Sequence, residues 1–133
     1  MFDLLKFDVI KVNNYSGKLV ALESCRNVPF DIKRVYYIWG NNLHDIRGHH
    51  AHKKLEQVLI CVSGACDFIL DNGKEKAQVH LDNPAVGLYI KHNIWREFTN
   101  FSHDCVVMVL ASEHYDEKDY IRDYNEFLKV CDQ

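Results

Sequence analysis

Turn-forming residues recur along most of the chain and divide it into short apolar segments of strand length. Turns at intervals of roughly eight to twelve residues are typical of β-sandwiches and β-barrels. Ser63–Gly64 is expected to join two strands as a hairpin, and Asp71–Lys74 to form another tight turn. The predicted strands are Phe7–Val12, Lys18–Glu23, Lys33–Trp39, Gln57–Val62, Ala65–Leu70, Glu75–Leu81, Val86–Ile90, Ile94–Phe98 and Cys105–Ala111.

The C-terminal part has a different pattern. Tyr120, Tyr124, Phe127 and Leu128 follow helical spacing, and acidic residues precede them. This pattern predicts one amphipathic helix that packs on the β-structure. The expected fold class is all-β, a cupin-like jelly-roll sandwich or barrel with a short C-terminal α-helix. Residues 1–133 are expected to form a single domain.

Composition excludes several classes of protein. Hydrophobic residues make up 47% and charged residues 26% of the chain, with a formal net charge of −3, so no nucleic-acid surface is indicated. The N-terminus lacks the pattern of a signal peptide and no segment is long enough for a membrane helix, so a cytoplasmic location is expected. The five cysteines contain no C-x-x-C pair, which argues against a disulfide framework or a cysteine–zinc site.

A histidine pair is the strongest sign of chemistry. His50 and His52 are two residues apart and would share one face of a strand, whereas His49 would point to the other. Such a pair serves either as an acid–base couple or as two ligands of a metal. Many cupins add a glutamate, here Glu56, and a histidine from a later strand, but Arg96 stands where that histidine is expected. Because a guanidinium repels a cation, we expect no metal and no cofactor.

Several segments together resemble the sugar nucleotide 3,4-ketoisomerases of the WxcM type. The motif Arg47–Lys53, followed by Leu55 and Gln57, is similar to the histidine motif of that family, and Lys33–Ile38 precedes it as in that family. Further similarity covers Gly87–Ile90, Trp95–Glu97 and Val109–Tyr124. The resemblance implies an isomerase that moves the keto group of dTDP-4-dehydro-6-deoxy-D-glucose from C4 to C3. It also implies a place in the synthesis of a 3-amino-3,6-dideoxyhexose.

The implied reaction suits imidazole chemistry. Removing a proton from carbon beside a ketone, through an enediol, needs a base with a pKa near the working pH. By resemblance, His50 is expected to move the carbon proton and His52 to relay the proton between the oxygens. Gln57 is expected to hydrogen-bond a sugar hydroxyl, or alternatively a buried backbone group.

Charged and aromatic residues near the motifs are candidates for substrate binding. Arg47, Lys53 and Arg96 bring positive charge that suits a pyrophosphate. Tyr37 and Trp95 are expected to stack on the thymine or line the sugar pocket, although aromatic residues in strands are as often part of the core.

Two other functions remain compatible with the pattern: a metal-dependent cupin enzyme, and a non-catalytic cupin that only binds a sugar. For assembly, edge strands seek partners and the family it resembles forms dimers. We therefore expect a homodimer, with strand exchange and with Phe7–Glu23 near the interface.

Overall fold

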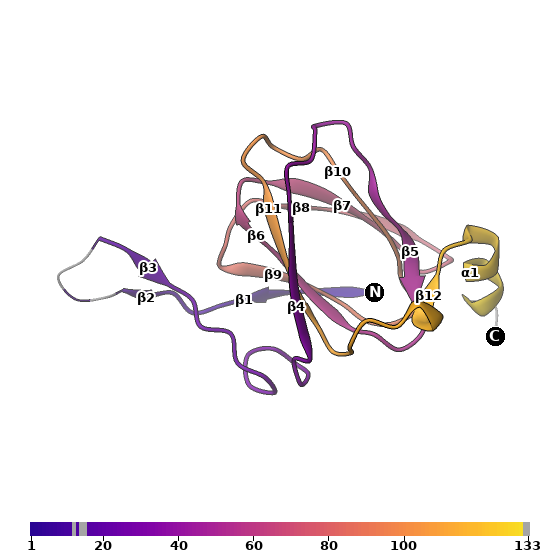
Figure 1. Ribbon diagram of the computed structural model, residues 1–133, viewed down its shortest axis with the longest axis horizontal. Coiled ribbons are helices and arrows are strands. Elements are labelled where there is room, and N and C mark those ends of the chain that lie inside the picture. Colours follow the sequence, from indigo (N-terminus) through magenta and orange to yellow (C-terminus); the bar gives the residue numbers. More distant parts are fainter. Residues whose placement is uncertain (12, 14–15, 132–133) are drawn as a thin grey trace.

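Two antiparallel sheets pack face to face and share one interior (Figure 1). Side chains that alternate along the strands point into this interior and to the outside in turn. The computed structural model describes residues 1–11, 13 and 16–131. One sheet has the order β1-β9-β6-β11-β4, the other has the order β12-β5-β10-β7-β8, and β2 and β3 form a separate two-stranded sheet. The first sheet contains β1 (Phe2–Lys6), β4 (Arg34–Trp39), β6 (Gln57–Ser63), β9 (Val86–Ile90) and β11 (Val106–Ala111). The second contains β5 (Arg47–His52), β7 (Cys66–Asp71), β8 (Lys76–Leu81), β10 (Trp95–Thr99) and β12 (Tyr120–Ile121), and the small sheet pairs β2 (Ile10–Lys11) with β3 (Lys18–Leu19).

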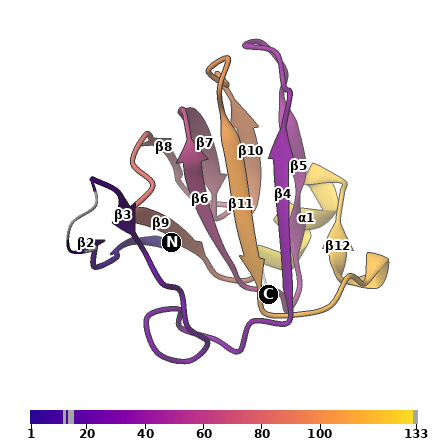
Figure 2. The same ribbon diagram turned by 60° about the vertical axis from the view of Figure 1, so that its left-hand side comes forward.

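The arrangement is the predicted cupin-like jelly roll with one short C-terminal helix. Helix α1 (Tyr124–Cys131) lies outside the second sheet beside β5 and β12, while the β2–β3 hairpin extends away on the opposite side (Figures 1 and 2). The main core fills the space between the sheets and includes Phe68, Phe98 and Val109. A second cluster, including Phe7, Phe30 and Ile60, covers the outer face of the first sheet.

The N-terminal predictions were wrong in detail. The described part of Phe7–Val12 contains only the short strand β2, Val12 lies outside the described residues, and the strand predicted over Lys18–Glu23 is limited to Lys18–Leu19. The strand β1 at Phe2–Lys6 was not predicted. It pairs with β9, and such pairing with a distant segment overrides weak local alternation.

Two connections also differ from the prediction. The strands on either side of Ser63–Gly64 do not pair as a hairpin; the turn instead carries the chain from the first sheet to the second. Tyr120 does not belong to the helix. A 3₁₀ turn at Glu117–Asp119 is capped by Asp116, and Tyr120 then pairs with His52 on strand β5. The helix begins only at Tyr124. No helix in the described ranges is long and apolar enough to cross a membrane.

Candidate active site

The histidine strand is shaped by a bulge at Gly48 and His49. Gly48 has a φ of +94°, and a Cβ there would lie 2.7 Å from the backbone oxygen of Arg96. On the paired strand β10, Arg96 faces His50 and Glu97 faces Gly48, so His49 is the extra residue. Its φ is +56°, and its exposed ring lies 3.9 Å from the carboxylate of Glu97. The bulge therefore separates His49 from the other two histidines.

His50 and His52 lie together on the inner face of β5. Their ring centroids are 4.8 Å apart, with an interplanar angle of 85°. The ring of Tyr120 contacts both, at 5.0 Å from His50 and 4.4 Å from His52. The predicted pairing of these two side chains on one face is thus present.

Hydrogen bonding fixes the tautomer of His50. Its Nδ1 lies 3.0 Å from the carbonyl oxygen of Gly48. Because a carbonyl oxygen only accepts, Nδ1 carries the hydrogen and Nε2 of the neutral ring keeps its lone pair. Burial, and then the charge of Arg96, lowers the pKa of His50 to about 4, although the Gly48 contact acts in the opposite direction. At neutral pH this ring is therefore a free base.

His52 is oriented in the same way by a carboxylate. Its Nδ1 donates to Asp119 Oδ2 at 3.0 Å, and its buried Nε2 has no hydrogen-bond partner among the described residues. Burial, followed by Arg96 and His50, holds the pKa of His52 well below its usual range. Asp119 also accepts a backbone hydrogen bond from Lys54 at 2.8 Å, so the carboxylate is itself fixed. His52 is therefore neutral and rigidly held.

A buried polar chain lies behind the histidines. Arg96 is fully buried and donates to the carbonyl oxygen of Ile94 and, by a short contact, to the side-chain oxygen of Gln57. The amide nitrogen of Gln57 donates to the hydroxyl of Tyr36 at 2.9 Å. Burial lowers the pKa of Arg96 to about 10, which leaves the guanidinium charged at neutral pH. A fixed positive charge thus stands next to both imidazoles.

The two sheets enclose a cavity of about 480 Å³ in front of His50. Three arginines surround it: Arg34, Arg47 and Arg122. Nε and Nη2 of Arg34 are buried without hydrogen-bond partners in the described part of the chain. Arg122 lies over the ring of Tyr120, with its Cζ 4.3 Å from the centroid, and forms two hydrogen bonds with Glu117. The cavity is therefore suited to an anionic ligand.

Five of the eight predicted site residues come together here. Two of them, His50 and Arg47, line the cavity, and His52, Arg96 and Gln57 form the buried layer behind it.

The other three predicted residues lie elsewhere. Trp95 is adjacent to Arg96 and so points to the opposite face of β10, where its ring packs 5.8 Å from Phe127 of helix α1. Tyr37 lies on the outer face of β4, 63% exposed and 5.7 Å from the ring of Trp39. Lys53 is exposed, and its backbone N–H donates to the carbonyl oxygen of Asp119.

Sequence reasoning missed several residues of the site, namely Arg34, Tyr36, Tyr115, Asp119, Tyr120 and Arg122. Strand alternation could have identified Arg34 and Tyr36, because every second residue of β4 faces the interior. The C-terminal residues gave no such signal, since their placement depends on the pairing of β12 with β5.

Nearly the whole chain matches a known family. The model of the family described as FdtA, WxcM-like, C-terminal, matches residues 3–132. The chain belongs to this family. A curated relative, TDP-4-oxo-6-deoxy-alpha-D-glucose-3,4-oxoisomerase from Aneurinibacillus thermoaerophilus, is 55% identical over 119 residues, covering 90% of this chain and 86% of the relative.

Solved structures of related enzymes share this fold. The TDP-quinovose 3,4-ketoisomerase WlaRB from Campylobacter jejuni is 50% identical with a TM-score of 0.91, covering 96% of this chain and 97% of the other. A histidine-to-asparagine variant of the 3,4-ketoisomerase QdtA from Thermoanaerobacterium thermosaccharolyticum, in complex with TDP-4-keto-6-deoxyglucose, is 44% identical with a TM-score of 0.94. That match covers 98% of this chain and 93% of the other.

Proposed function

We propose that this protein is a 3,4-ketoisomerase acting on a TDP-linked 4-keto-6-deoxyhexose. The observation that carries the proposal is the pair His50 and His52 on the inner face of β5, with His50 lining the cavity and His52 directly behind it. Both rings are neutral, each Nδ1 is hydrogen-bonded, and neither Nε2 has a hydrogen-bond partner among the described residues. Family membership supports the same reaction, since the relatives described above are 3,4-ketoisomerases or oxoisomerases.

The two histidines divide the proton transfers. His50, which lines the cavity, removes the proton from C3, and the C3–H electrons form the C3–C4 double bond of an enediolate with its negative charge on O4. Loss of the O3 proton then forms the new ketone at C3, and C4 receives a proton from His50. His52, behind His50 and hydrogen-bonded to Asp119, relays the proton from O3 to O4. No atoms are gained or lost, as an isomerisation requires.

The arginines around the cavity bind the nucleotide diphosphate. Arg34 offers two buried donor atoms that have no hydrogen-bond partner among the described residues, and Arg47 and Arg122 add charge at the same cavity. Arg96 has another role, because its donors are occupied by Ile94 and Gln57. Together with burial, which is the larger cause, its charge keeps the imidazoles neutral. The same charge stabilises the negative charge that develops on the enediolate oxygens.

The donor set does not fit the usual cupin metal. Glu56, the expected carboxylate ligand, contacts the hydroxyl of Tyr89 in the cluster that covers the outer face of the first sheet. Arg96, at the place of the third histidine, is a buried cation beside both imidazoles. A divalent ion would be repelled there and would find two ligands instead of the three or four that it requires.

We further propose that the protein forms a homodimer. Val35, Tyr37 and Trp39 lie exposed along the outer face of the edge strand β4. The β2–β3 hairpin extends away from the barrel (Figure 1). Ile10 and Leu19 of this hairpin are exposed. An unpaired edge and a protruding apolar hairpin are suited to strand exchange with a second copy. Light scattering at micromolar concentration should give twice the mass of the chain, and a monomeric mass would refute this part.

The isomerisation is tested by incubating the protein with TDP-4-keto-6-deoxyglucose in deuterated water and following the sugar by NMR. The expected result is a 3-keto product with deuterium at C4, and its coupling constants define the configuration there. Binding of the sugar nucleotide without exchange at C3 would indicate a non-catalytic binding protein instead.

A further inference from the structure

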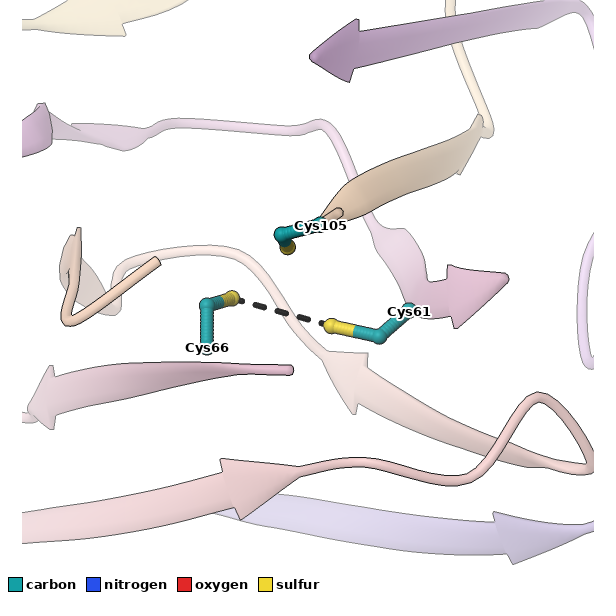
Figure 3. Close-up of side chains that lie close together, drawn as sticks. All are labelled: Cys61, Cys66 and Cys105. Atoms are coloured by element: carbon teal, nitrogen blue, oxygen red, sulfur yellow. Dashed lines mark hydrogen bonds between the residues drawn. The ribbon is translucent and has the colours of Figure 1, made fainter. Parts of the chain in front are cut away.

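Three cysteines meet in the barrel interior, at the opposite end of β6 from Gln57. Cys61 comes from β6, Cys66 from the start of β7 and Cys105 from the residue before β11. Figure 3 shows the sulfur atoms of Cys61 and Cys66 facing each other, with Cys105 beside them. All three Sγ atoms lie within 4.8 Å of one another, and those of Cys61 and Cys66 are 3.7 Å apart. The proposed isomerisation makes no use of these thiols.

The surroundings of the cluster favour the neutral thiol at Cys66 and Cys105. Cys61 and Cys66 are fully buried and Cys105 is 5% exposed, within the main apolar core. Burial raises the pKa of Cys105 to about 12, and the Cys61 contact together with burial raises that of Cys66. A divalent metal held by three thiolates would leave a net negative charge in this core, which is costly. A disulfide leaves no charge.

The backbone holds the three sulfurs together. Cys61 and Cys66 flank the turn that carries the chain from one sheet to the other, so their side chains face each other across the interior. At the turn, a Cβ on Gly64 would lie 2.8 Å from the Cα of Cys105, which fixes the third segment against the other two. A disulfide between Cys61 and Cys66 requires the sulfurs to approach by about 1.7 Å.

We propose that Cys61 and Cys66 are a dithiol site that a peroxide oxidises reversibly to an internal disulfide, with Cys105 as a third thiol within exchange distance. The side chains of Cys66 and Cys105 hydrogen-bond Cys61 and lower its pKa, which makes Cys61 the nucleophile. Its sulfur attacks the O–O bond, giving a sulfenic acid and one water from hydrogen peroxide. The sulfur of Cys66 then displaces the hydroxyl as a second water, so two thiols lose two electrons and two protons in total. An added dithiol reverses the reaction.

The test treats the full-length protein with hydrogen peroxide, blocks remaining thiols under denaturing conditions and maps the peptides by mass spectrometry. The expected product is a Cys61–Cys66 linkage, with the mass reduced by two hydrogen atoms and restored by dithiothreitol. Cys66→Ala should abolish the linkage, whereas Cys25→Ser, at an exposed cysteine, should leave it unchanged. Cys105→Ala should also retain it, because the reacting pair is intact.

Two results would overturn the proposal. In the first, the protein without substitutions is exposed to enough hydrogen peroxide to oxidise Cys25, and Cys61 and Cys66 are still recovered as blocked thiols. This result does not depend on whether any variant folds. The other is zinc bound at one ion per chain in the purified protein and lost in Cys66→Ala, which would identify a metal site instead. Neither result bears on the proposed isomerisation, because neither measures turnover.

Discussion

Asparagine substitutions at the three neighbouring histidines provide the sharpest test of the proposed mechanism. His50 is the histidine that lines the cavity, and asparagine can occupy its place but cannot take up a proton. General acid–base groups contribute roughly 100- to 10,000-fold to turnover. His50→Asn should therefore lower kcat by about that factor, which corresponds to about 3 to 5 kcal/mol in activation free energy.

Binding should change much less than turnover. The arginines assigned to the diphosphate, Arg34, Arg47 and Arg122, are untouched by the substitution, so KM should stay within about threefold. His52→Asn should also be damaging, but exchange of the C3 proton with solvent should persist, because enediolate formation precedes the relay between the oxygens. Turnover and C3–deuterium exchange, both followed by NMR, separate these two defects.

His49→Asn is the matched control. The side chain is exposed at the bulge, and asparagine tolerates its φ of +56° better than most residues. Turnover should therefore remain within about twofold of the unmodified protein. Full activity in His50→Asn, or a collapse in His49→Asn alone, would mean that the catalytic face of β5 has been assigned incorrectly.

Four further outcomes are expected. Asp119→Asn should lower kcat by roughly 100-fold or more, because an amide can stabilise the wrong tautomer of His52. The pH profile of turnover by this variant should also shift, whereas its substrate binding should be unchanged. Since burial and Arg96 lower the pKa of His50 to about 4, kcat/KM should stay level down to about pH 5 and fall only near pH 4; a fall centred near pH 6.5 would contradict this. Gly48→Ala should lower the free energy of unfolding by about 1–3 kcal/mol in urea titrations, because the new Cβ meets the Arg96 backbone. Treatment with a chelator should leave turnover unchanged, and loss of activity that returns with added metal would refute the metal-free mechanism.

The lowered pKa of His50 also affects stability, with a defined sign. Its ring in the unfolded chain takes up a proton near pH 6.5, whereas in the folded protein it does so only near pH 4. Between these values the unfolded state binds more protons, so the free energy of unfolding should decrease as the pH falls from about 6.5 to 4. His50→Asn should weaken this dependence, which urea titrations at several pH values would measure.

Most of the sheet structure could be predicted because turns and two-residue alternation are local properties. The strand pair β7–β8, for example, is joined by the predicted turn Asp71–Lys74. Local rules did not distinguish a hairpin from a crossing between sheets at Ser63–Gly64, since the turn residues are suited to both. They also could not find β12, which has two residues and therefore no periodicity.

Alternation limited the site prediction in a specific way. Trp95 and Arg96 are neighbours in one strand and cannot both face the barrel interior, and the buried hydrogen bonds show that Arg96 is the one that does. On β4 the inward face carries Tyr36 instead of the predicted Tyr37. Sequence spacing tells which residues share a face, but the packing of the opposite sheet determines which face becomes the interior.

Burial reverses one expectation about the chemistry. From sequence, a histidine base would have a pKa near neutrality, whereas burial and the guanidinium of Arg96 make the ring of His50 a weaker base. The same guanidinium lies behind both imidazoles, where it opposes protonation of the base but stabilises negative charge on the enediolate. The ketone also acidifies the C3 proton, so a weak base that is fully deprotonated suffices. Replacing Arg96 with the neutral, flexible methionine should therefore raise the pKa of His50 and lower turnover together, which a pH profile of the variant would measure.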